Sequence, residues 1–167
     1  AFNVAGAVCT LLIIGLCVRG IVHAKYIKVT PYEVTISKTV PDTDKLKVVL
    51  VADTHFGYNA GVIHAHELVR KINKQKPDLV CIAGDIFDNE YDAIRSPEQL
   101  AKVLRSIKST YGVYACWGNH DLNEAILAGF TFHHKGDNIS DVKDPRMNEF
   151  LRKSNIKLLE DESVLID

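Results

Sequence analysis

The sequence lacks an excess of one charge, a closely spaced cysteine pair and a starting methionine. Its 20 basic and 21 acidic residues give a formal net charge of -1, so no global basic field recruits nucleic acid. The four cysteines lie in apolar runs without a C-x-x-C pair, and we interpret them as small buried hydrophobic residues rather than disulfide partners. The 167 residues suffice for one domain with a core. Because no methionine begins the chain, we expect a piece of a longer protein.

Residues 1–18 also lack charge, and Asn3 and Thr10 are their only clearly polar side chains. A membrane-spanning helix needs about 20 mostly apolar residues. We therefore predict a transmembrane helix over residues 1–24, which a continuation upstream of Ala1 would complete. A secretory signal peptide, cleaved after residues 22–24, and a buried helix of a soluble protein are the alternatives.

Three basic residues follow the apolar run: Arg19, Lys25 and Lys28. The positive-inside tendency would place the rest of the chain in the cytoplasm, although the side of the membrane stays open without the other flank. Residues 25–45 are interpreted as a linker. Within it, residues 32–37 alternate apolar and polar, which predicts a short half-buried strand, and residues 40–45 predict a turn.

A pattern then repeats three times, in which a short apolar run ends in side chains of the kind that bind metals. The runs and their ends are residues 48–52 before Asp53 and His55, residues 79–83 before GDIFD (84–88), and residues 113–117 before GNHD (118–121). Between the runs, apolar residues recur at helical spacing, which predicts two helices. The residues of the first are Val62, His66, Val69 and Ile72, and those of the second are Leu100, Val103, Leu104 and Ile107. Ser96-Pro97-Glu98 is the predicted start of the second helix.

Strands alternating with helices predict an α/β fold with a parallel sheet. The continuous apolar runs are typical of strands buried on both faces. Ligands of such sheets bind at the carboxyl ends of the strands, where all three polar clusters lie. We therefore expect the clusters to form one site.

Four side chains of these clusters offer oxygen or imidazole ligands without thiolates: Asp53, His55, Asp85 and Asn119. That donor set suits Mn, Fe or Zn. Two divalent ions about 3.5–4 Å apart can orient a phosphate and activate a water between them, and His120 and Asp88 add a candidate acid–base pair. Each motif alone is common in turns, whereas three in this order indicate a metal site.

The complete set, Asp53-x-His55, Gly84-Asp85-x-x-Asp88 and Gly118-Asn119-His120-Asp121, resembles the calcineurin-like metallophosphoesterase superfamily over residues 46–167. The apolar N-terminus, and two short strands expected within residues 156–167, resemble its membrane-linked bacterial members. The resemblance implies the N-terminal half of a two-sheet α/β sandwich. It also implies that Asp53 and His55 hold the first metal, Asp85 bridges both metals and Asn119 binds the second. His120, paired with Asp88, would contact the phosphate and protonate the leaving group.

The sequence departs from the family in lacking a late Gly-His-x-His motif, so we expect the domain at 46–167 to be incomplete at its C-terminus and poorly active by itself. His133 and His134 do not match that motif and are interpreted as a solvated pair. The polar stretch at residues 129–146 is either a substrate lid or a surface insertion, and a short helix after Pro145 is expected to bury Met147, Phe150 and Leu151.

These observations predict a membrane-anchored, metal-dependent hydrolase of phosphoesters or pyrophosphates, acting on a phosphorylated small molecule or lipid. A nuclease or nucleotide phosphodiesterase of the same superfamily is one alternative, although the sequence has no electrostatic footprint for nucleic acid. A noncatalytic, membrane-anchored binding module is the other. The oligomeric state has no sequence signature.

Overall fold

The computed structural model describes residues 3–38, 44–121, 126–127, 130–131 and 144–166. The chain divides into two compact units, Ala1–Val34 and Thr35–Asp167. The first unit contains one helix, and the second contains a sheet with the helices that cover it.

The helix of the first unit is α1 (Val4–Ala24), 21 residues long, and none of its residues is buried. Its large apolar side chains are exposed all around the helix, for example Leu11 at 68% and Leu12 at 62%. The hydroxyl of Thr10 donates to the carbonyl of Gly6 at 2.9 Å, so this polar group has its partner within the helix. Among the described residues, α1 is long and apolar enough to cross a membrane.

The short strand predicted over residues 32–37 is wrong. These residues form neither helix nor strand, and the apolar side chains of Tyr32, Val34 and Ile36 are 87%, 79% and 73% exposed. Alternation alone does not make a strand, because a strand needs a neighbour for its backbone hydrogen bonds. Most of the turn predicted at residues 40–45 lies outside the described residues.

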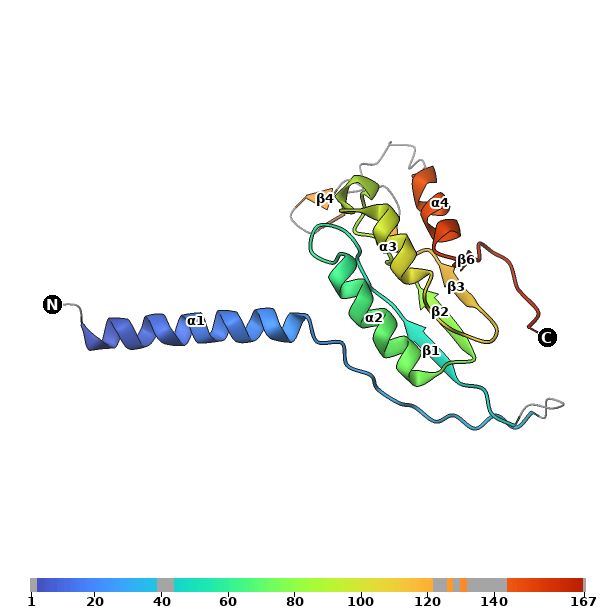
Figure 1. The fold of residues 1–167 in the computed structure, drawn as a ribbon, viewed down its shortest axis with the longest axis horizontal. Coiled ribbons are helices and arrows are strands. Elements are labelled where there is room, and N and C mark those ends of the chain that lie inside the picture. Colours follow the sequence, from blue (N-terminus) through green and yellow to red (C-terminus); the bar gives the residue numbers. More distant parts are fainter. Residues whose placement is uncertain (1–2, 39–43, 122–125, 128–129, 132–143, 167) are drawn as a thin grey trace. The chain divides into compact units, whose positions relative to one another are not determined.

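The second unit is a parallel four-stranded sheet in the order β1-β2-β3-β6, which confirms the predicted α/β class (Figure 1). Its strands are β1 (Val48–Val51), β2 (Leu79–Ala83), β3 (Val113–Cys116) and β6 (Lys157–Leu158), and its helices are α2 (Val62–Gln75), α3 (Pro97–Leu104) and α4 (Pro145–Lys153). Each connection moves one place in the same direction across the sheet. Because parallel crossovers are right-handed, all three helices lie over the same face.

Among the described residues, the helix-covered face of the sheet is the more buried one and the other face is exposed, which differs from the burial on both faces that we predicted. Val80 and Ile82 of β2 point into the core, whereas Val48 and Leu50 of β1 are 47% and 70% exposed. The cysteines follow the same rule: Cys81 is half-buried and Cys116 exposed on the open face. Cys9 and Cys17 are exposed on α1, so none of the four is the buried residue that we expected.

The helices confirm most of the predicted periodicity. In α2 the buried side chains are Ala65, Leu68, Val69 and Ile72, so His66, expected on this face, is instead exposed. In α3, Pro97 occupies the first turn, where its missing N–H costs nothing, and Ile107 lies beyond the helix end. In α4, Met147, Phe150 and Leu151 are buried as predicted.

The polar stretch at residues 129–146 lies largely outside the described residues, as do His133 and His134. Its described parts include β5 (Phe130–Thr131), which pairs antiparallel with β4 (Ile126–Leu127). Of the two short strands expected within residues 156–167, the described part of the chain contains the first, β6. Residues 160–166 form no strand there.

A charged clamp joins α4 to the short 3-10 helix η1 (Tyr91–Ala93). The Arg146 guanidinium donates to both oxygens of Asp92, at 2.7 and 3.1 Å, and to Asp144, which caps α4 by accepting from the Arg146 N–H at 2.9 Å. The same guanidinium lies 4.7 Å from the centre of the Tyr91 ring. Hydrogen bonds from Arg146 lower the pKa of both carboxyls.

We predict that this clamp makes stability depend on acid pH. Lowered pKa values mean that the stabilisation is complete above the ordinary carboxyl value of 3.8 and is lost as the pH falls through the folded-state pKa values. Arg146→Gln should therefore lower the thermal midpoint at pH 7, and its difference from wild type should narrow below about pH 4. Arg152→Gln, which removes only an ion pair with Glu149 within α4, is the matched control. If the difference in thermal midpoint between Arg146→Gln and wild type did not narrow in acid, the stabilising role of the Arg146 ion pairs would be contradicted.

Candidate metal centre

Three predicted ligands from two different loops converge at the carboxyl ends of β1 and β2. Asp53 and His55 follow β1, and Asp85 follows β2. Each offers one ligand atom, and these three atoms lie within 4.8 Å of one another. Asp53 is exposed, while His55 and Asp85 are half-buried. The cluster is therefore open to solvent on one side and anchored in the sheet on the other.

The backbone of all three residues is in the left-handed region, with φ of 55° at Asp53, 42° at His55 and 50° at Asp85. Such a conformation costs a non-glycine residue about 1–3 kcal/mol and persists only where the surrounding structure enforces it. Gly84, just before Asp85, also has a positive φ, of 76°. Strain that coincides with the candidate ligands favours a functional site over an ordinary turn.

Backbone hydrogen bonds hold the two loops together beyond the ends of their strands. The N–H of His55 donates to the carbonyl of Asp85 at 3.0 Å, and the N–H of Phe56 donates to Ile86 at 2.8 Å. The buried Thr54 hydroxyl adds a bond to the Ile86 carbonyl at 3.1 Å. Pairing therefore continues from the sheet into the site and fixes the ligands relative to each other.

The third motif follows β3 and packs directly on Asp85. The backbone N–H of His120 donates to Asp85 Oδ1 at 2.9 Å. A Cβ at Gly118 would clash with the backbone nitrogen and the carboxyl group of Asp85, so only glycine permits this approach. Asn119 lies between these two contacts, in the short helix η2 (Asn119–Asp121), and is exposed. The structure thus brings the Asn119 turn against Asp85, and its role as a ligand stays a prediction.

Asp121 is a structural residue of the site to which we gave no role from sequence. It is completely buried; its Oδ1 accepts from the Phe87 N–H and its Oδ2 from the Gly118 N–H, both at 2.8 Å. Burial raises the pKa of this carboxyl, and hydrogen bonds from the backbone of Gly118, Phe87 and Ile86 oppose that shift. The only sequence signal was its place at the end of GNHD. Its carboxylate joins the second and third motifs.

In the structure His120 contacts Asn89, whereas we expected Asp88 beside it; the catalytic pairing of His120 with Asp88 stays a prediction. His120 Nδ1 lies 3.1 Å from Asn89 Oδ1, and the Asn89 N–H donates to the His120 carbonyl at 3.0 Å. Asp88 instead lies 4.0 Å from His55 Nδ1. The left-handed backbone of Asn89, with φ of 61°, turns the chain there, and the sequence alone did not show this turn. The rings of His55 and His120 lie 5.0 Å apart, edge to face.

The donor set fits a divalent ion. Ligand atoms bound to one such ion at about 2.1 Å lie at most about 4.2 Å apart, so the observed spread requires only a small closure. Two carboxylates and an imidazole, without a thiolate, suit Mn, Fe or Zn. No cysteine belongs to this group of ligand atoms.

Comparison with known proteins agrees with this geometry. The model of the calcineurin-like phosphoesterase family matches residues 46–163. The chain belongs to this family. The match covers the whole sheet, the three helices over it and every predicted site residue.

Curated relatives of this family have similar sequences in animals and bacteria. The chain is 33% identical over 116 residues to a transmembrane protein with metallophosphoesterase domain from Danio rerio, an alignment that covers 69% of this chain and 26% of the relative. It is 27% identical over 114 residues to the UDP-2,3-diacylglucosamine pyrophosphatase LpxG of Chlamydia trachomatis, covering 68% and 33%. The matched segments thus span about a quarter to a third of these relatives.

We predict that Gly118→Ala weakens divalent metal binding by about 10–100-fold, as a change in the groups that orient a ligand commonly does. The added methyl group would displace Asp85, the residue that both other motifs contact. Mn²⁺ binding measured by calorimetry tests this, with circular dichroism to show that the helices remain. Gly61→Ala is the control, because a Cβ at Gly61 meets no atom within 4 Å. Unchanged Mn²⁺ affinity in Gly118→Ala would contradict the placement of Asp85 in the centre.

Proposed function

We propose that the chain is an anchored part of a metal-dependent hydrolase of phosphoesters or pyrophosphates. Residues 1–24 would be the membrane anchor, residues 25–45 the linker and residues 46–167 a phosphoesterase domain. The observation that carries the proposal is the convergence, at the strand ends, of three residues whose backbones are strained and whose side chains could bind a metal. Family membership supports phosphoester hydrolysis as the reaction class.

Four residues would hold two divalent ions: Asp53, His55, Asp85 as the bridging carboxylate, and Asn119. When bound, such ions neutralise a phosphate and supply a nucleophile at neutral pH. The protein's own part is to fix the ligands. Asp85 is fixed by the His120 N–H at one carboxylate oxygen, and Asp88, 4.0 Å from His55 Nδ1, is placed to orient that imidazole.

His120 would donate a proton to the leaving-group oxygen. An amide oxygen only accepts hydrogen bonds, so Asn89 Oδ1 selects the form of His120 that carries a proton on Nδ1. The proton that His120 transfers would then come from Nε2 of the doubly protonated ring, and the neutral ring left behind would keep its Nδ1 proton on Asn89 Oδ1. Asn89 thereby takes the orienting role that the sequence suggested for Asp88.

The substrate we propose is a phosphoester or pyrophosphate close to the membrane surface. Two properties of this chain support that choice: α1 fits a membrane span, and the net charge of -1 offers no attraction for polyanions. The bacterial relative named as a UDP-2,3-diacylglucosamine pyrophosphatase also supports it. A full-length protein that binds metal but hydrolyses no phosphoester or pyrophosphate would instead favour the noncatalytic module.

We predict that His120→Asn in the full-length protein lowers the catalytic rate by roughly 10²–10⁴-fold with nearly unchanged metal content. The loss should be largest for alkoxide leaving groups and smaller for a nitrophenolate, which leaves without needing a proton. Asn89→Ala should show a weaker loss with the same dependence on the leaving group, because it removes the partner that orients the imidazole. A leaving-group series beside metal analysis measures both effects.

Asp88→Asn is the matched comparison, since the structure places Asp88 beside His55. Its loss should not depend on the leaving group. Equal losses for His120→Asn across the series would remove the acid role from His120. Loss of one metal from His120→Asn would make His120 a ligand instead.

A further inference from the structure

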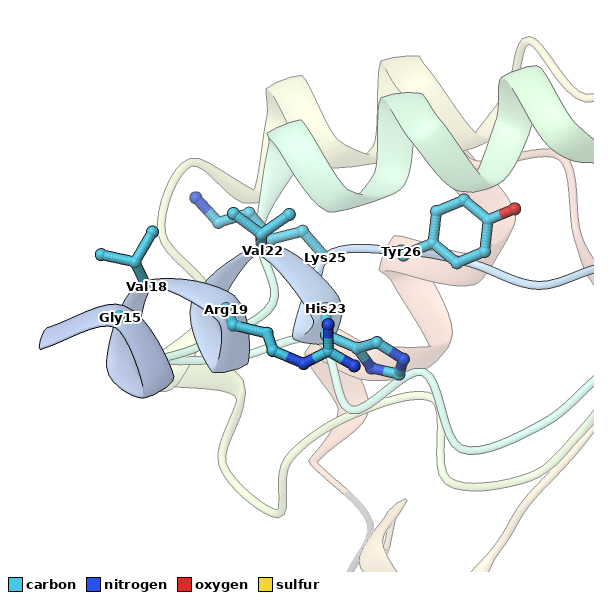
Figure 2. Close-up of a pocket in the computed structure, with 7 residues that line it drawn as sticks. All are labelled: Gly15, Val18, Arg19, Val22, His23, Lys25 and Tyr26. Atoms are coloured by element: carbon cyan, nitrogen blue, oxygen red, sulfur yellow. The ribbon is translucent and has the colours of Figure 1, made fainter. Parts of the chain in front are cut away.

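A shallow hollow runs along one face of α1 near its carboxyl end, and seven residues line it (Figure 2). They are Gly15, Val18, Arg19, Val22, His23, Lys25 and Tyr26. Gly15, Val18, Arg19, Val22 and His23 are spaced three or four residues apart or lie beside such a position, so they share a helix face, and Lys25 and Tyr26 follow the helix end at Ala24. Gly15 opens the hollow at its inner end, because it has no side chain and a Cβ there would meet no atom within 4 Å.

The hollow is apolar toward the middle of the helix and basic toward its end. Gly15, Val18 and Val22 form the apolar part. Figure 2 shows the Arg19 side chain extending along the helix toward His23, past the level of Val22. The sequence has no acidic residue before Glu33, so no neighbouring carboxylate in residues 1–32 neutralises Arg19 or Lys25.

The position of the hollow along α1 matches the boundary of a bilayer. A 21-residue helix is about 31 Å long, close to the roughly 30 Å thickness of the hydrocarbon core. Gly15 then lies about 14 Å inside the helix end at Ala24, at acyl-chain depth. Lys25 and Tyr26 lie at the level of the headgroups, where aromatic and basic residues are typical.

We propose that this hollow binds a membrane phospholipid with an anionic headgroup. One acyl chain would lie against Gly15, Val18 and Val22, and the phosphate would meet Arg19 and Lys25. Two fixed positive charges without a carboxylate favour an anionic headgroup over a zwitterionic one, whose choline cation they would repel. The inference rests on α1 spanning a membrane and is independent of catalysis.

The same basic residues could serve only to stabilise the helix end and to anchor it at the membrane surface. Cations near the carboxyl end of a helix stabilise its dipole, and a long basic side chain bends toward water wherever it lies near a membrane surface. Basic residues near a membrane surface also attract anionic lipids without any binding site. A lipid site is therefore distinguished by an anionic preference that depends on the charges and shape of the hollow and not on equal charge elsewhere in the chain.

The experiment uses the full-length protein in vesicles of phosphatidylcholine alone or mixed with phosphatidylglycerol. After extraction in mild detergent, native mass spectrometry counts the lipids that stay bound. We expect phosphatidylglycerol to be enriched over its share of the vesicle. Since each basic residue near an anionic surface contributes about 1 kcal/mol, Arg19→Gln with Lys25→Gln should reduce the enrichment by about fivefold per charge.

Two further variants separate charge from shape. Lys38→Gln with Lys45→Gln removes the same charge from exposed positions outside the hollow and should leave the enrichment intact. Gly15→Leu fills the apolar end without a change in charge and should reduce retained lipid of both kinds. The proposal would be overturned if wild type showed no enrichment of phosphatidylglycerol. It would also be overturned if the Arg19 and Lys25 variant kept the enrichment, or if the Lys38 and Lys45 variant lost it to the same extent.

Two other experimental outcomes would also overturn the lipid site. A dimer mass in wild type that Gly15→Leu abolishes, without any lipid preference, would assign the hollow to a second copy of the chain and overturn the lipid site. Release of the protein into the supernatant of an alkaline carbonate wash would contradict the membrane anchor, and the lipid site with it. The catalytic proposal would survive either result.

Discussion

The buried carboxylate of Asp121 is the interaction on which the site depends. One of its oxygens accepts from the Phe87 N–H and the other from the Gly118 N–H, so a single side chain joins the loops after β2 and β3. Leaving such buried donors without a partner costs about 1–3 kcal/mol each. Asp121 therefore holds the two loops in a fixed position relative to each other. His120 and Asp85 then meet across this join, and Asp85 keeps its strained backbone because neighbours on both sides hold it.

The order of the strands explains why the site has one open side. Each parallel crossover of the second unit advances in the same direction, so α2, α3 and α4 cover a single face and the loops after β1, β2 and β3 gather at one edge of the sheet. The covered face supplies the rigid core, with Phe87 stacked edge to face on Phe150 at 5.4 Å. Rigid packing behind Phe87 fixes the loop that carries Asp85, Asp88 and Asn89, while the ligand atoms stay accessible to solvent.

Sequence reasoning located the strand ends and their ligands because a change from apolar to polar residues marks where a buried strand ends. It failed where the answer depended on neighbours in space. Continuous apolar runs cannot show whether one face or both are covered, so the exposure of Leu50 was missed. The partner of His120 depends on the left-handed turn at Asn89, and residues 32–37 have the alternation of a strand without a neighbour to pair with.

The central claim is that Asp53, His55 and Asp85 form one metal centre at the strand ends. Electron paramagnetic resonance of Mn²⁺ titrated into the protein tests it directly, with Asp85→Ala beside wild type and Asp78→Ala as a control for a carboxylate at the opposite end of β2. The account predicts that Mn²⁺ loses its free-ion signal with wild type and the control, and keeps that signal with Asp85→Ala. Equal binding by wild type and Asp85→Ala would contradict it.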